Sequence, residues 1–159
     1  MKSMVLVAGL ISVPAAVSHQ PEHGYPPTQV VDARLVRLQQ FFEARDCPLR
    51  EVAADFLSAA DRYALDWRLL PSISMIESSG GKDYRNNNVF GWDYPLQSFS
   101  SVREGIHYVA AQLARSDRYK NKSLDGKLRT YNPNPEYSGK VRAVMQAMGP
   151  SDPQTETVD

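Results

Sequence analysis

A glutamate closes an apolar helical run near the middle of the chain. Residues 69–76 are mostly apolar, Glu77 follows them, and Ser78-Ser79-Gly80-Gly81 comes next. A carboxylate at such a helix end is partly removed from water yet open to a cleft, which raises its pKa and suits general-acid catalysis. Because Asn86-Asn87-Asn88-Val89-Phe90-Gly91-Trp92 lies just downstream, the sequence predicts a sugar-cleaving site with Glu77 as the acid.

The segment 86–92 offers the contacts that a saccharide needs. Amide side chains such as Asn88 can bind hydroxyl and N-acetyl groups, and the rings of Phe90 and Trp92 can pack on the C–H face of a sugar. Gly91 would let the backbone approach the substrate closely. Core packing is the alternative role for the two aromatic residues, and a turn is the alternative role for the asparagines.

Helices are expected to position these residues. Apolar residues recur every three or four positions, and Asp66 and the Ser101-to-Glu104 capping box mark helix starts. No stretch has a convincing strand pattern, and residues 82–99 are expected to be a loop with at most one short hairpin. The sequence therefore predicts a mainly α fold, with helices at 30–44, 48–65, from Asp66 to Gly80-Gly81, at 102–116, 124–129 and 135–148.

The composition of the chain limits which binding partners and which kinds of catalytic site are expected. The chain has 159 residues, enough for one domain, and its 18 basic and 18 acidic residues balance, so no global charge attracts nucleic acid or an acidic membrane. Cys47 is the only cysteine, so it forms no internal disulfide and is expected to be buried. The three histidines are scattered, and we expect no metal and no cofactor.

The two ends of the chain differ in composition from the middle. Residues 1–18 join one positive charge to a short apolar stretch and small residues, which predicts a signal peptide and an exported, periplasmic or extracellular protein. A buried N-terminal helix or an uncleaved anchor are the alternatives. A flexible spacer (19–29), one domain (30–149) and a disordered tail (150–159) are expected to follow, with no other membrane segment and a monomeric state.

Residues 50–149 resemble the lysozyme-like superfamily, and within it the glucosaminidase-type peptidoglycan hydrolases. The resemblance is carried by the pair Glu77-Ser78, by Asn87-Asn88-Val89-Phe90-Gly91, by residues 99–106, and by Tyr131 with residues 137–141. The pair Tyr131-Asn132 is also similar to the Tyr-Asn pair of lytic transglycosylases, a neighbouring branch with the same fold.

This resemblance implies a compact lysozyme-like helical domain that cleaves β-1,4 bonds between the amino sugars of peptidoglycan strands. It implies that Glu77 is the general acid and that Ser78, Asn88, Tyr131 and Asn132 lie at the substrate. Tyr131 would line the cleft opposite Glu77 and orient the substrate, whereas Tyr137 is expected in the core.

A second carboxylate is the point at which this chain departs from the resemblance. Glucosaminidases of this type often place that carboxylate in a lobe after the catalytic glutamate, and residues 78–85 are too few to build one. Asp83 and Asp93 are the nearby candidates, although either could cap a loop turn. Three alternatives stay open: a single-acid hydrolase, a lytic transglycosylase, and a domain that binds glycan or a partner without cleaving it.

Overall fold

The computed structural model describes residues 31–152, all of which fall within one compact unit. The predicted signal peptide (1–18) and spacer (19–29) lie outside the described residues, as does most of the expected tail. The described part is helical and contains no strand, which confirms the mainly α prediction. None of its helices is long and apolar enough to cross a bilayer.

The described part of the chain contains six α-helices and one short 3-10 helix. In order they are α1 (Ala33–Glu43), η1 (Pro48–Val52), α2 (Ala53–Tyr63), α3 (Leu69–Ser78), α4 (Val102–Arg115), α5 (Leu124–Tyr131) and α6 (Tyr137–Ala147).

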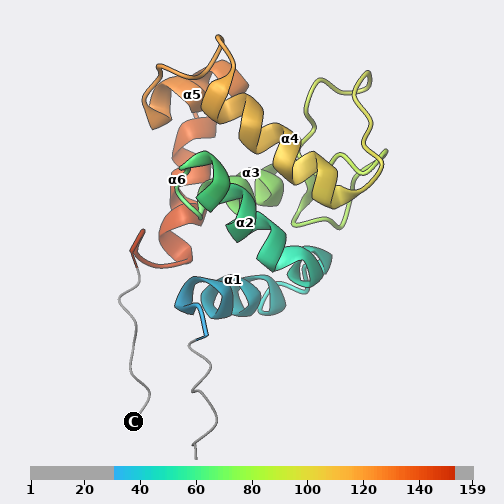
Figure 1. Ribbon diagram of the computed structural model, residues 1–159, viewed down its shortest axis with the longest axis vertical. Helices are drawn as coiled ribbons and strands as arrows, with labels where there is room; N and C mark the ends of the chain where they lie inside the picture. The colour runs from blue at the N-terminus through green and yellow to red at the C-terminus, as the bar shows by residue number, and fades with distance from the viewer. Residues whose placement is uncertain (1–30, 153–159) are drawn as a thin grey trace, which may run out of the picture. The chain divides into compact units, whose positions relative to one another are not determined.

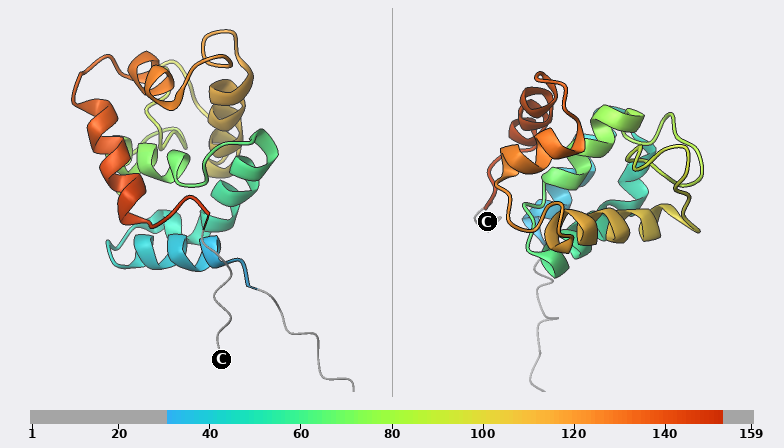
Figure 2. Two further views of the ribbon diagram at one scale, coloured as in Figure 1. Left: turned by 90° about the vertical axis from the view of Figure 1, so that its left-hand side faces the viewer. Right: turned by 90° about the horizontal axis from the view of Figure 1, so that it is seen from above.

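Helix α3 lies in the middle of the other helices (Figures 1 and 2). It packs against α6 and α2, while α2 also packs on α4 and on α1, and α5 packs on α6. The irregular segment between α3 and α4 runs beside α4 (Figure 1). Because α3 is central and a long loop follows it, the last turn of α3 can meet residues from several other elements at the surface.

Most of the predicted apolar stripes form the core. Fully or nearly buried positions occur on every α-helix, and among the largest are Phe42, Phe56, Leu70, Ile106, Leu128 and Val141. Val31 is an exception, because it is 58% exposed just before the helix that it was expected to join. Cys47 is buried, as expected, with its Sγ 3.6 Å from the Sδ of Met75.

Several predicted helix boundaries shift for local reasons. The first helix begins at Ala33 because Asp32 accepts a hydrogen bond from the Arg34 amide. The second is split into η1 and α2, and α2 ends at Tyr63 because the next residue, Ala64, has a left-handed φ of 51°. The last helix begins at Tyr137 rather than at Pro135, after a turn in which Asn134 Oδ1 accepts from the Glu136 amide.

The other predicted helix ends also differ slightly. Asp66 accepts from the Arg68 amide, so it stabilises the turn before α3 instead of the first turn of the helix. Ser101 caps α4 through the Glu104 amide, but the Glu104 carboxylate reaches back to Ser100. The described residues continue to 152, past the predicted domain end at residue 149, and Trp67 Nε1 donates to the Ser151 carbonyl over 2.9 Å.

Candidate active site

Helix α3 is buried at its start and emerges at its end. Residues 69–74 are all buried, whereas Met75, Ile76 and Glu77 are only partly buried. The chain then turns sharply through left-handed backbone, with φ of 51° at Ser79, 70° at Gly80 and 84° at Gly81. This turn ends the helix and leaves Glu77 at the boundary between the core and solvent, as its place in the sequence predicted.

The two carboxyl oxygens of Glu77 have different surroundings. The hydroxyl of Tyr137, in the first turn of α6, donates to Oε1 over 2.7 Å. Oε2 faces Gly91, since a Cβ built on that glycine would lie 3.1 Å from it. Burial raises the pKa of Glu77 above its ordinary value, and the hydrogen bond from Tyr137 opposes part of that rise.

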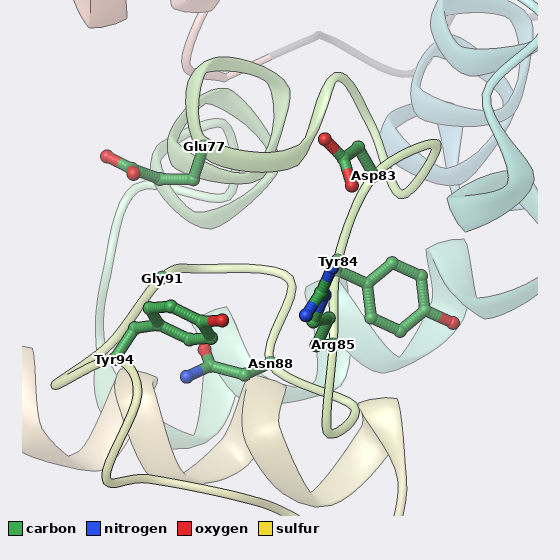
Figure 3. Close-up of a pocket in the computed structure, with 7 residues that line it drawn as sticks. All are labelled: Glu77, Asp83, Tyr84, Arg85, Asn88, Gly91 and Tyr94. Carbon is green, nitrogen blue, oxygen red and sulfur yellow. The ribbon is translucent and has the colours of Figure 1, made fainter.

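A pocket of about 540 Å³ opens in front of Glu77 (Figure 3). Glu77 and Asp83 come from the end of α3 and the turn after it, and the remaining lining residues come from the loop before α4. Those residues are Tyr84, Arg85, Asn88, Gly91 and Tyr94. The pocket therefore combines two carboxylates, a guanidinium, an amide and two phenol rings, a mixture suited to a polar ligand with an apolar face.

Asn88 lines this pocket, but its amide is largely used within the loop. Its Nδ2 donates to the carbonyls of Trp92 (2.8 Å) and Gln97 (3.3 Å), and its Oδ1 accepts from the Trp92 amide (3.0 Å). Both donors are therefore occupied, and one acceptor site on Oδ1 remains for a ligand. The sequence predicted that this amide binds substrate. In the structure its hydrogen bonds mainly hold the loop in its folded form.

A second pocket, the aromatic pocket, has a volume of about 360 Å³ and shares Gly91 with the first. It is lined by Gly91, Trp92, Asp93, Arg118, Tyr119 and Tyr131. Trp92 packs against Tyr131 and Tyr119, with ring centroids 5.6 and 5.8 Å apart. Gly91 lines both pockets, so the aromatic pocket and the pocket that contains Glu77 meet at a residue without a side chain.

Tyr131 links the aromatic pocket to the acid. Its ring stacks on Tyr137 with centroids 5.9 Å apart and planes 10° apart, and its hydroxyl donates to the Phe90 carbonyl. Burial, together with the nearby Glu77 charge, raises the pKa of Tyr131 well above its ordinary value, and the pKa of Tyr137 is raised as well. Both phenols therefore stay protonated at neutral pH.

Three of the predicted substrate-binding residues line neither pocket. The Ser78 hydroxyl is buried, donates to the Ser74 carbonyl and accepts from the Gly81 amide, so it stabilises the helix end. Phe90 is fully buried and packs edge-on against Phe56, as in its alternative role. Asn132 caps the end of α5, and its Oδ1 accepts from the Asn134 amide.

The two candidate second carboxylates fall in different pockets. Asp83 is exposed and shares the pocket of Glu77, whereas Asp93 is exposed and lines the aromatic pocket. Among the described residues, no three potential metal ligands gather into a cluster.

Sequence reasoning placed Tyr137 in the core and missed its contact with Glu77. Its ring is buried, as expected, but its hydroxyl makes the hydrogen bond that fixes the carboxyl. A buried tyrosine usually has a hydrogen-bond partner for its hydroxyl, and this is the feature from which a polar contact of Tyr137 could have been predicted. Tyr84, Arg85, Tyr94 and Arg118 were also missed, because no local pattern distinguishes them from surface residues.

Comparison of the chain with known protein families, with curated proteins and with solved structures finds no match.

Proposed function

We propose that the protein is an exported peptidoglycan hydrolase, built on a lysozyme-like helical domain, that cleaves β-1,4 bonds between amino sugars. The observation that carries this proposal is the half-buried Glu77 carboxyl, held by Tyr137 at the edge of a polar pocket with an aromatic pocket next to it. The site is proposed to need no cofactor.

General-acid catalysis by Glu77 follows from its surroundings. The departing sugar oxygen must receive a proton, because an alkoxide leaves poorly. A raised pKa keeps a larger fraction of the carboxyl protonated near neutral pH. Since Tyr137 occupies Oε1, Oε2 on the Gly91 side is the oxygen that is available to carry the proton.

The two pockets suit two neighbouring sugars of a strand. Gly91 has no side chain, so a polymer can cross it from the Glu77 pocket to the aromatic pocket. In this pose the scissile bond lies beside Glu77, and Trp92 offers its ring to the C–H face of the adjacent sugar.

Asp83 is the candidate for a second catalytic carboxylate, because it shares the pocket of Glu77 and Asp93 does not. If Asp83 does not act, the N-acetyl group of the substrate can stabilise the developing charge at C1. A β-N-acetylglucosaminidase is the activity that we propose first, and a lytic transglycosylase, which forms an anhydro product, is the alternative.

Incubation of the full chain with purified cell-wall sacculi tests this proposal. We expect soluble muropeptides, whose ends mass spectrometry can identify. Reducing N-acetylglucosamine ends would indicate a glucosaminidase, reducing N-acetylmuramic ends a muramidase, and anhydro-muramic ends a lytic transglycosylase. Release of none of these products would refute the enzymatic proposal.

A glycan-binding domain without catalysis is the second candidate. It is favoured by the internal hydrogen bonds of Asn88 and Tyr131, which leave few polar atoms free to position a substrate. Cosedimentation with sacculi, without release of fragments, would support this candidate instead.

A further inference from the structure

The aromatic pocket contains one charge of each sign, carried by residues from different elements. Asp93 belongs to the loop between α3 and α4, and Arg118 belongs to the connection between α4 and α5. No ion pair joins them in the described part of the chain, since the guanidinium of Arg118 instead donates to the Thr130 carbonyl over 3.2 Å. The guanidinium carbon Cζ of Arg118 also lies 5.7 Å from the ring centroid of Tyr119.

The segment that carries Arg118 is basic although the whole chain is neutral. Residues 117–129 contain five basic and two acidic side chains. Both acidic side chains are paired, Asp117 with Lys120 at 2.6 Å and Asp125 with Arg142 at 2.7 Å. Arg118 therefore lies in a locally positive segment, and no carboxylate of residues 31–152 forms an ion pair with it.

We propose that the aromatic pocket recognises a carboxylate carried by the amino-sugar strand, and that Arg118 is the residue that binds it. A guanidinium is the side chain best suited to a planar carboxylate, which it can bind through two parallel hydrogen bonds. Trp92 and Tyr131 hold the sugar, and the Asp93 carboxylate accepts a hydrogen bond from a hydroxyl or amide of the same unit. This inference rests on the proposed function and names the residue by which the site would distinguish an acidic amino-sugar strand from a neutral, chitin-like one.

Two sources can supply such a carboxylate. In peptide-free strands it is the lactyl group of N-acetylmuramic acid, and in intact strands that group is amide-linked, so the carboxylate would come from the stem peptide. Both carboxylates place a negative charge next to the sugar ring, and this charge is what Arg118 is proposed to bind.

Binding measurements on the full chain carrying Glu77→Gln test the inference without turnover. The probes are peptide-free glycan strands, the same strands with their carboxylates amidated, peptide-bearing strands, and chitin oligomers. Arg118→Gln should weaken binding of the peptide-free strands about three- to tenfold, a range that fits one exposed charge-assisted hydrogen bond. It should leave binding of the amidated strands and chitin oligomers within twofold. Comparison with peptide-bearing strands tells which carboxylate is preferred.

Three further variants separate charge recognition from a structural role. Arg118→Lys should restore part of the affinity, and it should keep the salt dependence that Arg118→Gln loses. Asp93→Asn keeps a side-chain oxygen that can accept the hydrogen bond from the sugar and removes a charge that repels the carboxylate, so it should strengthen binding of the peptide-free strands about twofold. Arg129→Gln, on the same basic segment but lining neither pocket, is the matched control and should change affinity less than twofold.

The inference is overturned if Arg118→Gln weakens binding of charged and amidated strands equally, or if no probe binds. These outcomes differ from failure of the proposed activity. A protein that cleaves sacculi without any preference for the carboxylate would keep the activity and lose this inference. A protein that never cleaves, but whose carboxylate preference depends on Arg118, would do the reverse.

Discussion

Replacement of Gly91 by alanine is the sharpest single perturbation of the site. The glycine has φ of +59°, and a Cβ there would lie 3.1 Å from Oε2 of Glu77. A left-handed conformation costs a residue with a Cβ about 1–2 kcal/mol. The carboxyl must also move by a few tenths of an ångström. Because a misplacement of about 1 Å can cost about 100-fold in rate, we expect a loss of about three- to tenfold in muropeptide release.

Gly139→Ala is the matched control for this experiment. Gly139 lies in α6, and a Cβ there would meet nothing within 4 Å, so this variant should be about 0.5–1 kcal/mol more stable than the wild type. Chemical denaturation should therefore separate the two variants by about 1.5–3 kcal/mol. If Gly91→Ala were as stable as Gly139→Ala and fully active, the geometry described around Glu77 would be wrong.

Three other variants test the parts of the site separately. Tyr137→Phe removes the hydrogen bond that lowers the pKa of Glu77, so the alkaline limb of the pH–rate profile should move to higher pH; an unchanged profile would argue against the contact. Asn88→Ala leaves the Trp92 and Gln97 backbone groups without partners and should cost about 2–4 kcal/mol in denaturation, whereas a loss below about 1 kcal/mol would exclude its bracing role. Burial raises the pKa of Glu77 in the folded state, so protonation of Glu77 adds to the free energy of unfolding. This contribution is complete below the ordinary pKa of 4.5 and is lost as the pH rises through the raised pKa. Glu77→Gln should therefore match the wild type in acid and be more stable at neutral pH, and denaturation curves showing the opposite trend would contradict the burial.

The helices could be predicted because their apolar residues keep a helical period. Phe56, Ala59 and Ala60 on α2, for example, are buried as their spacing indicated. Boundaries were less predictable, because they depend on single contacts such as the Asp32 side chain with the Arg34 amide. Val31 fits the apolar period but precedes that cap, so it stays in solvent.

The site could be predicted only where its residues are close in sequence. Glu77 and the loop from Asn86 share a local signal, a helix end followed by amides and glycine. Tyr137 and Arg118 reach the site through the packing of α6 and the α4–α5 connection, which no local pattern encodes. The sequence also could not reveal how Asn88 uses its amide, because that depends on how the loop folds back to Trp92.

Release of soluble muropeptides from sacculi, compared between the wild type and Glu77→Gln, is the most direct test of the central claim. Glutamine keeps the shape of the side chain and the acceptor for Tyr137 but cannot donate the proton. We predict that the wild type releases fragments and that Glu77→Gln lowers the rate at least about 100-fold, as the loss of a general acid should. A Glu77→Gln protein that releases fragments as fast as the wild type would contradict the assignment of the acid.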